Sequence, residues 1–142
     1  RSSVLARGVN HADPRKAWTV GVGHPLHPGK RVAELHLRDQ GMGTAGSGTQ
    51  FFEHEGKRYG HVIDPRTGWP AIDVYTATAV THAAATADAL ATAFYVLGPG
   101  GTAEYCATHP NVAAILVCPG EGEQTIDLHA FNLSDDAWTR HG

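Results

Sequence analysis

An alanine-rich segment from Ala83 to Leu97 constrains the fold more than any other stretch of this sequence. Its composition predicts a helix, and Gly98-Pro99 follows it with residues that typically end one. Apolar residues occupy every face of this helix, so we expect it to be buried on most sides. Its small side chains would also let neighbouring backbone approach closely.

The segments around this helix have the composition and the alternation of β-strands. A shorter helix is expected at Thr102–Thr108 and a helical turn near Ser134, whereas residues 1–16 are interpreted as an irregular connection. Strands interrupted by one long helix predict an α+β fold with a largely antiparallel sheet, in a single domain over residues 1–142. The expected strands are Trp18–Val22, Val32–Leu37, Gln50–His54, Arg58–Ile63, Tyr75–Thr81, Val112–Val117 and Thr125–His129.

Composition excludes some classes of partner. The formal net charge of −3 offers no basic surface, which argues against nucleic acid. No apolar run approaches the length of a membrane span, and no signal peptide is visible. The chain begins with Arg1 rather than Met, which is compatible with a removed leader or a longer preceding segment. Cys106 and Cys118 either pair with each other or remain small core residues.

Gly56–Pro70 is the stretch in which chemistry-bearing residues gather. It predicts the second strand of a hairpin that turns at Glu55-Gly56, and the strand stops at Asp64-Pro65 because proline denies it a donor. Gly68 can take the positive φ of a tight reversal. His61 and Asp64 therefore lie at a strand end, where binding and catalytic groups concentrate. On turn chemistry alone, a purely structural hairpin is the stronger interpretation.

A single carboxylate, Asp88, lies in the apolar helix, with Thr92 one turn later on the same face. A carboxylate in such surroundings needs a counter-charge, and the helix contains no Lys or Arg. Two partners are open: Arg66 in a structural ion pair, or a hard cation such as Mg²⁺ bound by Asp88 and Thr92. Gly41–Gly48 has two interpretations as well, a loop that brings backbone N–H groups to a phosphate or a glycine-rich bulge or strand edge.

Two strings in this sequence carry a family resemblance. The first is Gly56-Lys57-Arg58-Tyr59-Gly60-His61-Val62-Ile63-Asp64-Pro65-Arg66-Thr67-Gly68-Trp69-Pro70, and the second is Ala87-Asp88-Ala89-Leu90-Ala91-Thr92-Ala93-Phe94. Together they resemble the ApbE family of FAD:protein FMN transferases. Members of that family are considerably longer, so the resemblance implies that this chain is the C-terminal part of such a protein. Where the family has Ser-Gly-Asp-Tyr, this chain has Ser47-Gly48-Thr49-Gln50.

The resemblance implies a Mg²⁺-dependent reaction in which FMN passes from FAD to a Thr or Ser hydroxyl of an acceptor flavoprotein and AMP leaves. Export to the bacterial periplasm or cell envelope is implied too, with any membrane tether in an N-terminal segment outside this chain. Two alternatives stay open: a Mg²⁺-dependent FAD pyrophosphatase, and a non-catalytic flavin-binding or structural module. The implied site residues are His61 and Asp64 for catalysis, Ser47, Gly48, Arg66 and Thr67 for the flavin cofactor, and Asp88 and Thr92 for the metal.

Overall fold

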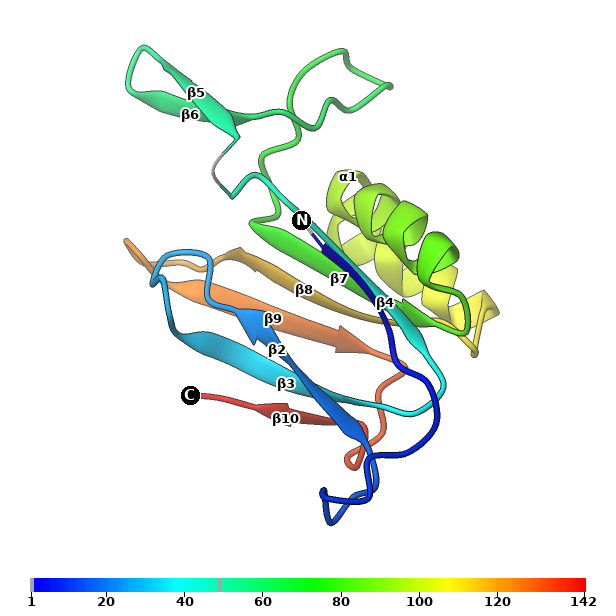
Figure 1. Ribbon diagram of the computed structural model, residues 1–142. Coiled ribbons are helices and arrows are strands. Elements are labelled where there is room, and N and C mark those ends of the chain that lie inside the picture. The colour runs from blue at the N-terminus through cyan, green and yellow to red at the C-terminus, as the bar shows by residue number, and fades with distance from the viewer. Residues whose placement is uncertain (1, 49) are drawn as a thin grey trace.

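The computed structural model describes residues 2–48 and 50–142 and has the expected α+β architecture (Figure 1). A five-stranded sheet has the order β1-β4-β7-β8-β9, a three-stranded sheet has the order β10-β3-β2, and β5 pairs with β6. Every one of these pairs is antiparallel, as predicted. The strands are Ser2–Leu5 (β1), Trp18–Gly23 (β2), Arg31–Leu37 (β3), Gly41–Gly46 (β4), Phe51–His54 (β5), Lys57–Gly60 (β6), Thr76–Thr81 (β7), Ala113–Pro119 (β8), Ile126–Phe131 (β9) and Trp138–Arg140 (β10), and the helix is Ala84–Thr108 (α1).

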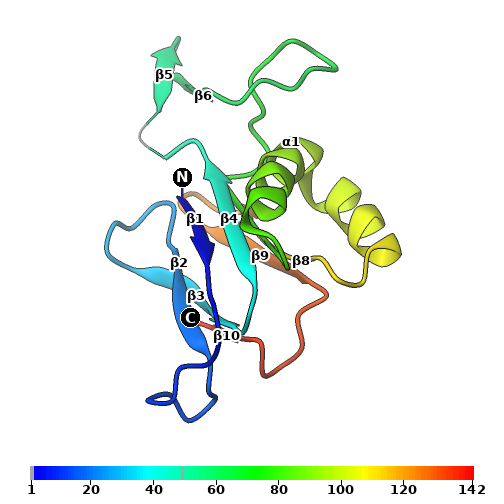
Figure 2. The ribbon, with the colours of Figure 1, turned by 45° about the vertical axis from the view of Figure 1, so that its right-hand side comes forward.

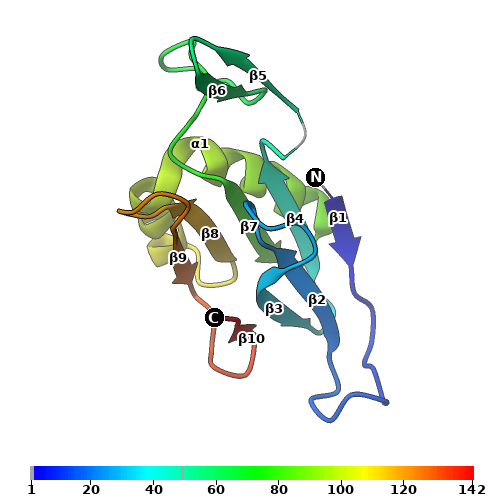
Figure 3. The ribbon, with the colours of Figure 1, turned by 90° about the vertical axis from the view of Figure 1, so that its left-hand side faces the viewer.

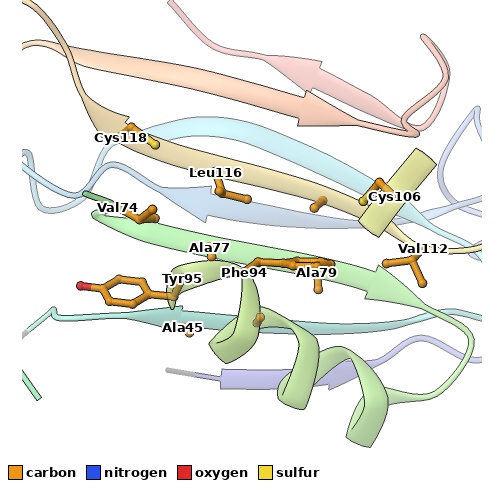
Figure 4. Packing of buried hydrophobic residues seen from close by; sticks show 12 residues of the cluster. Ala45, Val74, Ala77, Ala79, Phe94, Tyr95, Cys106, Val112, Leu116 and Cys118 are labelled. Atoms are coloured by element: carbon orange, nitrogen blue, oxygen red, sulfur yellow. The ribbon is translucent and has the colours of Figure 1, made fainter. Parts of the chain in front are cut away.

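The five-stranded sheet is covered by α1 on one face and by the three-stranded sheet on the other, which gives three layers (Figure 2). Successive residues of a strand point to opposite faces, so β8 contributes to both interfaces. Its Leu116 packs in the cluster beneath α1, whereas Ile115 and Val117 pack between the two sheets. Figure 4 shows Phe94 and Tyr95 of α1 in the first of these clusters. The continuous apolar run in β8 is thus explained by burial on two faces.

The helix differs from its prediction in burial, and its predicted end marks a break. α1 is assigned as one element to Thr108, but Gly98 has a non-helical φ of 69° and ψ of −173°. The predicted end at Gly98-Pro99 therefore coincides with a break between two helical parts, and the second part includes the residues of the expected shorter helix, Thr102–Thr108. Only one stripe of the helix is buried by the described residues, while Ala85 and Ala89 are exposed. The prediction of burial on most sides is therefore wrong for this part of the chain. Exposed alanines are tolerated because a methyl group presents little apolar surface.

Glycines in β4 let α1 lie directly on the sheet. A Cβ atom added to Gly41 would lie 2.3 Å from the backbone nitrogen of Ala84, and one added to Gly43 would lie 2.5 Å from the Cα of Asp88. The segment is an inner strand between β1 and β7, so its glycines serve close helix packing rather than a bulge or a sheet edge. This contact sets the position of Asp88 above β4.

The β5–β6 hairpin and the loop after it project away from both sheets (Figure 3). We call this segment, residues 51–73, the arm. The hairpin turns at Glu55-Gly56, as predicted, although β6 ends at Gly60 rather than at Ile63. The Phe52 and Tyr59 rings stack across its two strands with centroids 5.2 Å apart.

Besides β4, which was not among the expected strands, two further strands were not predicted. Residues 2–5 form β1 within the segment interpreted as a connection, and β10 follows a turn at residues 135–137. Both are short strands at the edge of a sheet, where pairing to a neighbour decides the conformation. Cys106 and Cys118 are buried and unpaired, which settles the alternative left open above. Within the described residues, α1 lacks the length of apolar sequence that crossing a membrane requires.

Candidate functional site

The turn at the end of the arm is built around the buried carboxylate of Asp64. The backbone N–H groups of Thr67 and Gly68 donate to the Asp64 carbonyl oxygen at 3.2 and 2.8 Å, and the Asp64 N–H donates to the carbonyl of Trp69 at 2.8 Å. Gly68 has a φ of 74°, as the turn prediction required. A bridge between Ile63 and Pro70 closes the loop. The sequence therefore predicted this turn correctly, down to its residues.

Arg66 forms a bidentate ion pair with Asp64. Its Nε lies 2.9 Å from Oδ1, and its Nη2 lies 2.7 Å from Oδ2. These hydrogen bonds lower the pKa of Asp64 and raise that of Arg66. The same Nη2 donates to the carbonyl of Val96 at 3.3 Å, which ties the turn to α1. Arg66 thus pairs with Asp64, which removes the interpretation in which it would serve as the partner of Asp88.

His61 lies at the base of the arm and faces α1 across a cavity of about 280 Å³. Thr92 lines the same cavity, together with Ala45 and Gly46 of β4. The Nδ1 atom of His61 lies 3.3 Å from the carbonyl oxygen of Gln50, so in the neutral ring this nitrogen carries the hydrogen and donates it. The Nε2 atom then keeps its lone pair, which is the arrangement that a proton acceptor needs.

Asp88 lies one helical turn before Thr92 on α1 and is partly exposed. The hydroxyl of Ser3 in β1 donates to its Oδ1 at 3.5 Å, and the hydroxyl of Thr92 donates to its main-chain oxygen at 3.4 Å. The carboxylate, the two hydroxyls and the carbonyl form a set of oxygen donors, which hard cations prefer. In the described part of the chain, no group of three or more His, Cys, Asp or Glu side chains is arranged to hold a metal.

Ser47 and Gly48 border a second cavity of about 130 Å³, beside the first. Gly60 of the arm, Thr76 of β7 and Tyr95 of α1 line it as well. The Thr76 hydroxyl is buried without a hydrogen-bond partner among the described residues, and such a group costs about 1–3 kcal/mol. The sequence analysis missed Thr76. The alternation of β7 places it on the same face as Thr78, but nothing in the sequence marks this hydroxyl as unpaired.

The predicted site residues fall into three neighbouring groups. His61 and Thr92 share the first cavity, with Asp88 one turn away along α1. Ser47 and Gly48 border the second cavity. Asp64, Arg66 and Thr67 line a third of about 320 Å³, between the turn of the arm and the part of α1 around its kink. The arm, β4 and α1 therefore bring all the predicted segments to one end of the sheet.

Comparison with known proteins identifies the family that this chain matches. Residues 2–116 match the ApbE family. An FAD:protein FMN transferase of Treponema pallidum is 36% identical over 125 residues, covering 82% of this chain and 34% of that protein. One from Haemophilus influenzae is 34% identical over 131 residues, covering 90% of this chain and 37% of that protein. The chain thus spans about a third of the length of these curated relatives.

Solved structures agree with this match. The crystal structure of the ApbE protein of Thermotoga maritima superposes with a TM-score of 0.66 at 27% identity, covering 84% of this chain and 38% of that one. The apo form of the flavinyl transferase ApbE of Pseudomonas stutzeri superposes with a TM-score of 0.68 at 26% identity, covering 93% of this chain and 42% of that one. The sequence match and the shared fold lead to one conclusion: this chain belongs to the ApbE family.

Proposed function

We propose that this chain supplies part of the active site of a Mg²⁺-dependent FAD:protein FMN transferase. Its relatives from Treponema pallidum and Haemophilus influenzae carry the name FAD:protein FMN transferase, and the chain matches about a third of each. The observation that carries the proposal is the cavity shared by His61 and Thr92, with Asp88 one helical turn away. This cavity brings a proton acceptor close to a set of oxygen ligands.

The residues around Asp88 fit a magnesium ion. Asp88 and Thr92 would hold it, because a carboxylate and a hydroxyl are the hard oxygen donors that Mg²⁺ prefers. When bound, Mg²⁺ supplies positive charge that neutralises the diphosphate of FAD. One carboxylate fills few coordination positions, which suits an ion that also binds substrate phosphates and water.

The chain's own side chains would then act on the acceptor protein. The acceptor's Thr or Ser oxygen attacks the phosphorus of the FMN half, the bond to the AMP oxygen breaks, and AMP leaves with the electron pair. The Nε2 atom of His61 accepts the hydroxyl proton, since Nδ1 is directed to the Gln50 carbonyl. Ser47 and Gly48 would bind the flavin nucleotide in the neighbouring cavity, where the Thr76 hydroxyl offers a further polar contact.

Asp64, Arg66 and Thr67 have a supporting role in this proposal. The ion pair between Asp64 and Arg66 fixes the turn and connects it to α1, so it holds the arm and His61 in place. We therefore propose Asp64 as a positioning residue for His61. The export of the protein to the bacterial cell envelope stays a prediction.

A full-length chimera tests the proposal, because this chain spans only about a third of the length of its curated relatives. This chain replaces the matching third of the Treponema pallidum relative, and the chimera receives FAD, Mg²⁺ and an acceptor protein. We expect covalent flavin fluorescence on the acceptor and one AMP for each FMN transferred. His61→Asn and Asp88→Asn should each lower the rate at least about 100-fold. His54→Asn, an exposed histidine on the same arm, is the matched control and should keep the activity.

Two outcomes would contradict the proposal. If the chimera unfolds cooperatively in a thermal melt, and is thus folded, but releases no AMP at any Mg²⁺ concentration, then these residues do not form the site. If AMP and free FMN appear without labelled acceptor, water replaces the protein hydroxyl and the chain belongs to a pyrophosphatase.

A further inference from the structure

A basic cavity lies outside the candidate site, where the β2–β3 loop, the beginning of β9 and the end of β10 meet. It has a volume of about 370 Å³, which is ample for a small organic molecule. Val32, Ile126 and Leu128 give it apolar walls. Its polar side chains are all cationic or titratable to cations: His24, His27, Lys30, Arg31, Arg140 and His141. No Asp or Glu side chain lines it among the described residues.

The backbone holds this cluster in a defined shape. The His24 N–H donates to the Lys30 carbonyl at 2.9 Å, and the Lys30 N–H donates to the His27 carbonyl at 3.1 Å. The N–H groups of Leu26 and His27 donate to Nδ1 of His24 at 3.1 and 3.2 Å. On the other side, the His141 N–H donates to the Val32 carbonyl at 2.8 Å. These hydrogen bonds fix the loop and the end of β10 on either side of the cavity.

The positive charge is only partly neutralised. Glu34 lies nearby and accepts from Arg31 at 2.7 Å, with His141 Nε2 at 3.6 Å. Across the described residues, Lys30 and Arg140 have no carboxylate within ion-pair distance. The pKa of His24 is lowered by burial and by its positive neighbours His27 and Lys30, which agrees with a positive local potential. The cavity thus keeps Lys30 and Arg140 outside ion pairs beside apolar walls, with the terminal carboxylate of Gly142 as the one anionic group among its described lining residues.

We propose that this cavity binds a phosphate monoester with a small apolar group. A phosphate monoester carries about −1.5 to −2 charges at pH 7, which matches Lys30 and Arg140 better than the single charge of a carboxylate does. The apolar group would contact Val32, Ile126 and Leu128, because these side chains gain from losing contact with water. This site is distinct from the proposed flavin site, since the two cavities share no lining residue.

Phenyl phosphate is the probe, titrated into the chain by calorimetry at constant ionic strength. Inorganic phosphate supplies the charge alone, and phenol supplies the ring alone. We expect phenyl phosphate to bind at one site and more tightly than either. Lys30→Gln and Arg140→Gln should each weaken it about five- to tenfold, because each removes one charge-assisted hydrogen bond from a partly exposed site. Ile126→Ala should weaken phenyl phosphate and leave inorganic phosphate unchanged.

Lys57→Gln, which removes a cation on the arm, is the matched control and should bind like the unmodified chain. All variants are first checked for an unchanged circular dichroism spectrum and thermal melt. Three results would overturn the proposal: phenyl phosphate binding no more tightly than inorganic phosphate, Lys30→Gln and Arg140→Gln both binding like the unmodified chain, or Lys57→Gln weakening binding as much as they do. The first result would show that the apolar walls contribute nothing to binding. The second would show that the anion does not bind at Lys30 and Arg140, and the third that any cation on the surface attracts it equally.

Discussion

Replacing Gly43 with alanine tests how α1 is placed on the sheet. An added Cβ atom would lie 2.5 Å from both the Cα and the backbone nitrogen of Asp88, and 2.6 Å from the carbonyl carbon of Ala87. Carbon atoms in contact prefer about 3.5–4.0 Å, so the helix must move from β4 by about 1 Å. The obstructing atoms belong to the backbone of α1, and the added methyl group is fixed to the backbone of β4, so no side-chain rotation can relieve the contact.

The cost can be set within limits. Overpacking of a core costs about 1–3 kcal/mol, and the loss of glycine's freedom in the unfolded chain returns about 0.4–1 kcal/mol. The two ranges combine to a loss of about 0–2.6 kcal/mol. Because the obstructing atoms of α1 are backbone and cannot rotate away, we expect Gly43→Ala to lie in the upper part of this range and to lower the free energy of unfolding by about 1–2 kcal/mol. For a domain of this size, that is a decrease in Tm of about 3–8 °C. Because the displaced atoms belong to Asp88, the same variant should weaken binding of Mg²⁺ in the proposed site.

Urea unfolding followed by circular dichroism measures the free energy of unfolding, with Gly23→Ala as the matched control. Gly23 lies in β2, has no atom within 4 Å of an added Cβ and does not have a positive φ, so its replacement should leave the stability within about 0.5 kcal/mol of the unmodified chain. If Gly43→Ala unfolds at the same urea concentration as Gly23→Ala, α1 does not rest on the glycines of β4 and the reasoning is refuted.

Three further predictions follow from single side chains. Burial of His36 lowers its pKa, and the positive charge of Arg15 lowers it further, so the free energy of unfolding should fall as the pH drops below about 6.5. His36→Gln should make this fall less steep in urea unfolding, and an equally steep fall would contradict the prediction. Hydrogen bonds from Arg66 lower the pKa of Asp64, so Arg66→Gln should lower the free energy of unfolding at pH 7 and have a smaller effect as the pH falls below about 4. An effect that stays constant down to pH 2 would exclude the ion pair as its cause. Burial raises the pKa of Cys118 to about 11, so this thiol should react with a disulfide reagent at pH 8 far more slowly in the folded chain than in urea, and equal rates would show that it is accessible.

The turn of the arm shows how far sequence reasoning reaches. Its strand end, its proline stop and its glycine reversal are local, because each depends on the φ angles and hydrogen bonds of adjacent residues. The antiparallel α+β architecture was also predictable, since alternation and helix composition are local patterns. The pairing of Arg66 with Asp64, two residues apart, belongs to the same local level. The sequence analysis considered Arg66 as a partner for Asp88 and as a residue for the flavin cofactor, and so missed this pair.

The sequence by itself determined most of the secondary-structure pattern, the turn and the family to which the chain belongs. Only the tertiary structure decided that His61 and Thr92 line one cavity, that Gly43 lies beneath Asp88, and that Lys30 and Arg140 border another. Propensities and turn chemistry act over a few residues, whereas these contacts join residues far apart in the chain. Such contacts depend on which faces of the helix and sheets pack together. That choice is made by side-chain packing across the layers, which forms only when the whole chain folds.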